Sequence, residues 1–133
     1  MPDDSYNFSF SGLKSAVINY LHKCETSGAE IKKADVAASF QQAVVDVLVE
    51  KTVNACMVNN IKQAALSGGV ASNSALRAAA ADACEKRGIG LFIPPPRLCT
   101  DNAVMIACRA FFDYKRGRFG DLSLNAYPGL GLG

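Results

Sequence analysis

Residues 62–73 read KQAALSGGVASN, an apolar run of strand length that is followed directly by two glycines. Further along, residues 90–99 read GLFIPPPRLC, a second short apolar run that ends in three prolines. The alanine-rich segment from about Asn73 to Arg87 separates these runs and is followed by Gly88, which is typical of a helix and its C-terminal stop. This order predicts a β-α-β unit with parallel strands and a right-handed crossover.

The spacing of apolar residues predicts three more helices around this unit. They are expected at about residues 11–23, 33–59 and 100–116. Ser11 and Thr100 are the candidate N-caps of the first and last of these helices, because a hydroxyl oxygen can accept a hydrogen bond from the first turn. Residues 26–28 are expected to form a turn. Residues 118–133 are expected to be an irregular tail, so the predicted domain covers residues 1–117.

The chain has 133 residues, half of them hydrophobic and a fifth charged, which suits one soluble domain with its own core. No apolar run approaches the ~20 residues that a membrane-spanning helix needs. The opening MPDD is too acidic for a secretory signal, so a cytoplasmic protein without membrane contact is expected. The net charge of +2 is too small to indicate nucleic-acid binding by itself.

Five cysteines occur with wide spacing and without a C-x-x-C motif, which favours reduced thiols over disulfides or a zinc site. Three of them lie in predicted helices and are expected to act as small apolar residues: Cys56, Cys84 and Cys108. His22 is the only histidine, and nothing in the pattern brings it next to Cys99 as the base of a nucleophile.

Both loops of the β-α-β unit, residues 67–72 and 94–99, are expected to leave the carboxyl ends of neighbouring strands, where open α/β sheets bind ligands. Gly68 and Gly69 leave the backbone uncovered for a close approach, and helix N-termini at this edge attract phosphate. Asn73 can both donate to and accept from a ribose or a base. The alternative is that the glycines only make a tight turn and that Ser72 or Asn73 only caps the following helix.

Asp101 follows the second loop at the same expected edge. Its carboxylate is a hard oxygen ligand, suited to a metal ion that holds phosphates. The alternative is an acidic residue in the first turn of the last helix, where the helix dipole favours it by about 0.3–1 kcal/mol. No residue is an evident general base, so no catalytic residue is assigned.

Three segments taken together resemble a known family: FSFSGLK at residues 8–14, SGGVASN at residues 67–73 and CTDN at residues 99–102. In this order and spacing they are similar to the C-terminal part of the TsaD/Gcp/Kae family. The accepted activity of that family is tRNA N6-adenosine threonylcarbamoyl transfer, and its older label is O-sialoglycoprotein endopeptidase or glycoprotease. The resemblance runs from about Tyr6 to Tyr127.

The resemblance implies the fold of actin, sugar kinases and Hsp70 (the ASKHA fold), in which two α/β lobes close on a nucleotide. The chain would then be part of the C-terminal lobe, helix-rich with a short parallel β-α-β unit. The family enzyme transfers the threonylcarbamoyl group from threonylcarbamoyl-adenylate to N6 of adenosine-37 in tRNAs that read ANN codons. The resemblance also implies that Asn73 contacts the adenylate or ATP nucleotide, that Gly68 and Gly69 lie beside it, and that Asp101 binds an iron or zinc ion.

Two departures from the family pattern shape these expectations. Family members are more than twice as long as this chain, and their other metal ligands are two histidines, four residues apart, without a counterpart here. We therefore expect a C-terminal fragment with an incomplete metal site, inactive without the missing N-terminal half. The resemblance further implies tRNA and TsaB- and TsaE-like subunits as partners. Missing strands are expected to leave an open sheet edge, which favours pairing with a second copy of the chain.

Two other functions stay open on the residues themselves. A glycoprotein metallo-endopeptidase is the older family label, although the sequence lacks H-E-x-x-H and a second histidine. A non-catalytic module would bind a nucleotide or a partner subunit through the open sheet edge and the long helix.

Overall fold

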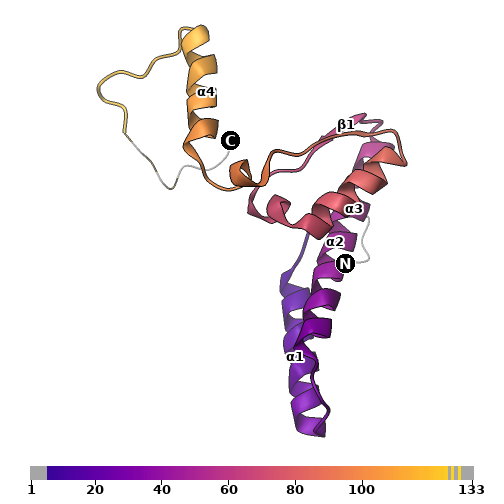
Figure 1. The fold of residues 1–133 in the computed structure, drawn as a ribbon. Coiled ribbons are helices and arrows are strands. Elements are labelled where there is room, and N and C mark those ends of the chain that lie inside the picture. Colours follow the sequence, from indigo (N-terminus) through magenta and orange to yellow (C-terminus); the bar gives the residue numbers. More distant parts are fainter. Residues whose placement is uncertain (1–5, 126, 128, 130–133) are drawn as a thin grey trace.

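The computed structural model describes residues 6–125, 127 and 129. This part of the chain is a helix-rich α/β structure with a short parallel sheet. In chain order its elements are α1 (Ser11–Ser27), α2 (Lys33–Val58), β1 (Gln63–Ala65), η1 (Gly69–Ser72), α3 (Ser74–Glu85), β2 (Gly90–Phe92), η2 (Pro96–Leu98) and α4 (Ala103–Lys115), where η marks a 3-10 helix. Figure 1 shows α1 and α2 as a helical hairpin, α3 and the sheet at one end of α2, and α4 standing apart.

The two strands confirm the expected β-α-β unit. β1 and β2 pair in parallel with Ala64 opposite Leu91, and α3 connects them while packing against α2 and β2. The glycine-rich and proline-rich segments end the strands early, because they turn the chain away from the ladder. Among the described residues the sheet has two strands, so one side of each strand is unpaired.

A small core lies where α2, α3 and the sheet meet. Cys56, Cys84 and Ile89 are buried together, and partly buried residues of both strands pack against them. Cys24 is buried near the end of α1. The expectation that cysteines in the predicted helices act as small apolar residues is therefore confirmed for Cys56 and Cys84, whereas it is wrong for Cys108, which is exposed.

The predicted N-cap and the predicted C-terminal end of α1 are wrong. Phe10 is the N-cap residue and its backbone is already helical, so Ser11 lies inside the first turn and makes no capping hydrogen bond. The carbonyl of Phe10 accepts from the amide of Lys14 at 3.0 Å, which starts the helix one residue earlier than the hydroxyl pattern indicated. At the other end α1 continues through Ser27, because the left-handed residue that stops it is Gly28, with φ of 68°.

Thr100 does not cap α4, contrary to the sequence prediction. The cap is Asn102, whose Oδ1 accepts from the amide of Met105 at 3.1 Å. Capping requires extended backbone directly before the first helical residue, and Asn102 has that conformation, with φ of −153° and ψ of 151°. The tight turn of η2 displaces the start of α4 beyond Thr100.

The chain after α4 carries no helix or strand within the described residues. Gly117, expected to close the last helix, has the left-handed φ of 66°. The rest of the predicted tail, residues 126, 128 and 130–133, lies outside the described residues. Among the helices that are described, none combines the length and the hydropathy that crossing a membrane requires.

Candidate functional site

The loops that follow β1 and β2 meet at one edge of the sheet, as the sequence predicts. η1 lies in the first loop and η2 in the second, and the two contact each other. Ser72 Oγ donates to the carbonyl of Pro96 at 3.5 Å. A Cβ placed on Gly69 would lie 4.0 Å from Cγ2 of Thr100. This edge therefore brings together residues more than 20 positions apart in the sequence.

The two glycines of the first loop have different structural roles. Gly68 has φ of 90°, a backbone conformation that residues with a Cβ rarely adopt, so the turn itself requires glycine there. Gly69 has an ordinary φ, and its nearest neighbour would be at normal van der Waals distance from an added Cβ. Neither the turn nor the packing of the described residues explains a glycine at position 69.

Asn73 caps α3, so the capping role that the sequence offered for this residue is confirmed. Its Oδ1 accepts from the amide of Leu76 at 3.0 Å, and its Nδ2 donates to Oε1 of Gln41 at 2.9 Å. The capping bond sets the orientation of the amide, with the oxygen toward the helix and the nitrogen toward α2. One N–H of Asn73 and one lone pair of its oxygen are left over for a ligand.

An open cavity of about 550 Å³ lies beside this amide pair, between α2, η1 and the start of α3. Its walls are mainly apolar, and Gln41 and Asn73 supply its side-chain amides. The lining residues are Phe10, Ala37, Phe40, Gln41, Val44, Val45, Leu48, Val70, Asn73 and Leu76. A flat, largely apolar group with polar atoms on one edge fits such a surface.

Sequence reasoning missed Gln41. On α2, the cavity is lined by side chains at positions 37, 40, 41, 44, 45 and 48, which follow the helical repeat. Gln41 is the one polar member of this stripe. A polar side chain that interrupts an apolar stripe is a usable signal for a binding residue, because its amide can pair with polar atoms of a ligand that contacts the stripe.

Asp101 lies just before α4, exposed to solvent. Because α4 begins at Ala103, Asp101 is outside the helix and the alternative of an acid in the first helical turn is wrong. The preceding residue, Thr100, is the neighbour of Gly69 across the two loops. Asp101 is therefore next to the sheet edge where Gly68, Gly69 and Asn73 lie.

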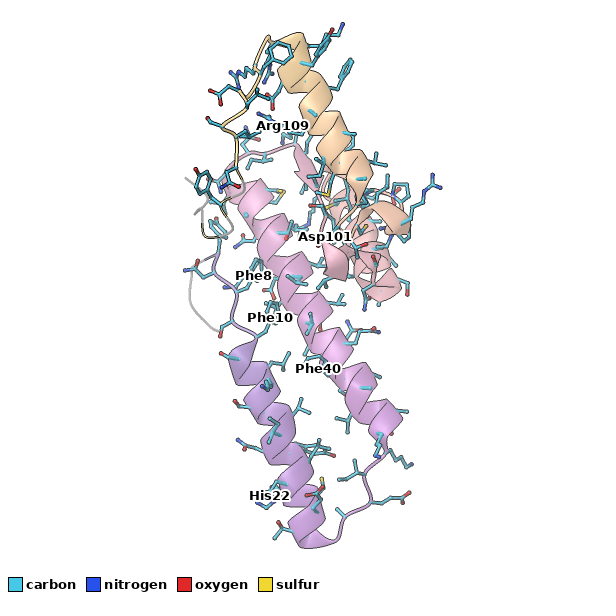
Figure 2. The ribbon with its side chains drawn as sticks, turned by 90° about the vertical axis from the view of Figure 1, so that its left-hand side faces the viewer. Phe8, Phe10, His22, Phe40, Asp101 and Arg109 are labelled. Atoms are coloured by element: carbon cyan, nitrogen blue, oxygen red, sulfur yellow. The ribbon has the colours of Figure 1, made fainter. Side chains whose placement is uncertain are left out.

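The described residues do not fit a complete metal site. No three His, Cys, Asp or Glu side chains come together in the part of the chain that the structure describes. Figure 2 shows His22 near the end of α1 that lies away from Phe10, and Asp101 on the opposite part of the molecule. Asp101 is thus a single candidate ligand, whereas protein metal sites use three or more.

Four of the five thiols are buried, and none is paired in a disulfide. Burial raises the pKa of the Cys84 thiol, and the neighbouring Cys56 raises it further. Cys99 Sγ is buried against the carbonyls of Pro94 and Pro95 at 3.7 and 3.6 Å. Buried thiols of this kind are structural residues.

Comparison with known proteins identifies the family. The family model described as tRNA N6-adenosine threonylcarbamoyltransferase (TsaD) matches residues 1–108. The chain is 56% identical, over 131 residues, to the protein of that name from Clostridium botulinum (strain Kyoto / Type A2), covering 98% of this chain and 38% of the relative. Proteins of the same name from Clostridium novyi and Clostridium perfringens are 52% and 53% identical, with 38% and 39% of their lengths covered.

The chain therefore spans less than half the length of the curated relatives that it matches. The family model covers most of the chain, including the glycine-rich loop, Asn73 and Asp101. On this evidence the chain belongs to the TsaD family of tRNA N6-adenosine threonylcarbamoyltransferases.

Proposed function

We propose that this chain supplies the base-binding part of a nucleotide site in an enzyme that transfers a threonylcarbamoyl group. The donor is threonylcarbamoyl-adenylate and the acceptor is N6 of adenosine-37 in tRNAs that read ANN codons. The observation that carries the proposal is the apolar cavity with its Gln41–Asn73 amide pair, beside a glycine-rich turn. The family relationship supplies the class of reaction.

The cavity suits the base of an adenylate. An adenine ring is flat and apolar on its faces, and it carries donors and acceptors on its edge. The aliphatic side chains and Phe10 can contact the faces, while the amides of Gln41 and Asn73 lie where they can pair with the edge or with the ribose. Gly68 and Gly69 leave the nearby backbone uncovered for the phosphate.

The rest of the active site is proposed to lie outside this chain. The chain covers 38% of its relatives' length, and its described residues offer a single candidate metal ligand, Asp101. We therefore propose that it forms part of the C-terminal lobe of an ASKHA-type enzyme and is inactive without the complementary part. Binding of tRNA and of TsaB- and TsaE-like subunits is proposed for the assembled enzyme.

A second function suits the chain when it is alone. One side of each described strand is unpaired, and α4 exposes a row of large apolar side chains. A non-catalytic module that binds a partner subunit or a second copy would use such surfaces. No feature of the described residues favours a metallo-endopeptidase.

The test of the enzyme proposal is reconstitution. The chain is combined with the complementary N-terminal segment of a full-length relative, and threonylcarbamoyl transfer to tRNA is followed by nucleoside mass spectrometry. Activity is expected from the pair and from neither part alone. Transfer by the pair that is unaffected by Asn73→Ala and Gln41→Ala would contradict the assignment of the site. Gln42→Ala is the matched control, since its amide bonds to Asp46, one helical turn further along α2.

The binding step is tested on the chain itself. Isothermal titration with adenosine 5′-monophosphate should give an affinity that Gln41→Ala and Asn73→Ala each reduce by about tenfold, as the loss of one hydrogen-bond partner of the nucleotide predicts. Gln42→Ala should leave the affinity unchanged. Equal affinities for all four proteins would place the base elsewhere.

A further inference from the structure

One guanidinium group connects the two loops of the candidate site. Arg77 Nη1 donates to the carbonyl of Ala71 at 2.9 Å and approaches Cys99 Sγ at 3.7 Å. Ala71 belongs to η1 in the first loop, and Cys99 follows η2 in the second. Ala71 is 1% exposed and Cys99 is 5% exposed, so the guanidinium reaches into a part of the structure from which water is largely excluded.

The position of Arg77 is not one that a helix favours by itself. Arg77 lies in the first turn of α3, where the helix dipole disfavours a cation, whereas the basic pair Lys86 and Arg87 follows the C-terminus of the same helix, where cations are favoured. A charged donor gives a stronger hydrogen bond to a buried carbonyl than a neutral one. The contacts of Arg77 with Ala71 and Cys99 account for an arginine at this position, whereas the helix dipole does not.

The contacts of Arg77 lie between the residues proposed to bind the substrate. Ala71 is two residues before Asn73 and two after Gly69, and Cys99 is two residues before Asp101. The other side-chain bond between the loops, from Ser72 to Pro96, is at the distance limit for a hydrogen bond, at 3.5 Å. Arg77 bonds to Ala71 in the first loop at 2.9 Å and contacts the thiol sulfur of Cys99 in the second at 3.7 Å, so among the described residues it is a further side-chain connection between the loops.

We propose that Arg77 is a positioning residue, which holds the Asp101 loop at a fixed distance from the Gly68–Gly69 turn and Asn73. The inference rests on the proposed function, because it concerns the geometry of that nucleotide site. Arg77 touches neither the base nor the reacting atoms. It acts by keeping both loops in the arrangement that accepts the nucleotide.

The test uses Cys99 as a reporter of loop separation. The intact chain is treated with iodoacetamide, and alkylation of each cysteine is followed by peptide mass spectrometry. Arg77→Ala should raise the alkylation rate of Cys99 by about tenfold, as the loss of a charge-assisted hydrogen bond predicts. Arg77→Lys keeps the charge and should give an intermediate rate. Exposed Cys108 is the internal reference in every sample.

Arg87→Ala is the matched control. It removes the same charge just beyond the same helix, and no side-chain bond of Arg87 is seen in the described structure, so the rate at Cys99 should not change. If Arg77→Ala were to unfold the chain, Cys24, Cys56 and Cys84 would also be alkylated fast. The alkylation rate of Cys99 in Arg77→Lys would then test the connection between the loops. An unchanged Cys99 rate in both Arg77 variants overturns the connection between the loops.

A second readout separates positioning from mere stability. Adenosine 5′-monophosphate should slow alkylation of Cys99 in the wild-type chain, and Arg77→Lys should weaken nucleotide affinity severalfold without lowering the melting temperature. Faster alkylation with unchanged affinity would leave Arg77 a structural residue and overturn the positioning role. Absence of nucleotide binding by the wild-type chain would instead overturn the proposed nucleotide site, while the Cys99 rates still report whether Arg77 connects the loops.

Discussion

The side-chain amide of Asn73 donates to Oε1 of Gln41 at 2.9 Å, which ties the start of α3 to the middle of α2. The same Asn73 side chain accepts the hydrogen bond that caps α3. One residue thus combines a capping role, which belongs to the fold, with a place in the lining of the apolar cavity.

These two roles of Asn73 can be separated by substitution. Asn73→Asp keeps a capping oxygen but loses the N–H that Gln41 accepts, so the melting temperature should stay near that of the wild-type chain while affinity for adenosine 5′-monophosphate falls. Asn73→Ala should lose both the capping oxygen and the N–H. Loss of the cap should lower the free energy of unfolding by about 1 kcal/mol. Thermal unfolding and isothermal titration measure the two effects. Ser74→Ala, at the adjacent exposed position, is the control.

The two glycines should respond differently to alanine. Gly68→Ala forces a Cβ into a backbone with φ of 90° and should lower the free energy of unfolding by about 1–3 kcal/mol. Gly69→Ala meets no close neighbour and should leave unfolding unchanged, yet it should weaken nucleotide affinity, because its methyl group would cover backbone that the phosphate approaches. Urea unfolding and titration with adenosine 5′-monophosphate test this. Full affinity in Gly69→Ala would remove Gly69 from the site.

The raised pKa of Cys84 predicts a loss of stability in alkaline solution. In the unfolded chain this thiol ionises near pH 9.0, whereas burial beside Cys56 keeps it protonated to higher pH in the folded chain. Its contribution to the free energy of unfolding is therefore complete below pH 9.0 and decreases as the pH rises through the folded-state pKa.

Urea unfolding between about pH 8 and about pH 10.5 measures this decrease. Cys84→Ala lacks the ionising group and should show a shallower decline over this range than the wild-type chain. Cys108→Ala removes an exposed thiol and should follow the wild-type curve. Parallel curves for Cys84→Ala and the wild-type chain would mean that other groups cause the decline.

Asp101 should matter for activity and little for folding. The side chain is exposed and lies outside α4. Asp101→Ala should therefore change the free energy of unfolding by no more than an ordinary surface substitution does, within about 0.5 kcal/mol. In the reconstituted enzyme the same change should abolish transfer. Asp113→Ala, which removes the acid paired with Arg109 on α4, is the control. Retained transfer in Asp101→Ala would show that the carboxylate is not required.

Short-range features of the sequence predicted most of the elements. The glycine-rich and proline-rich loops marked the ends of the two strands, and the apolar spacing placed α2 and α3 within a few residues of their observed bounds. The structure selects Asn73 from the two candidate caps of α3, Ser72 and Asn73, and shows that the predicted caps Ser11 and Thr100 are wrong. A side chain caps only when the backbone before the helix is extended, and the residue type alone does not determine that conformation.

The sequence by itself indicated the family, the parallel β-α-β unit and the sheet edge at which Gly68, Gly69, Asn73 and Asp101 lie, because each is marked by short segments whose residue types and order can be recognised without the packing. Only the tertiary structure showed the pairing of Asn73 with Gln41, 32 residues apart, and the contact of Arg77 with Cys99, 22 residues apart. These contacts depend on how α2, α3 and the two loops pack. No local pattern encodes that packing, since it is set by the burial of apolar surface over the whole unit.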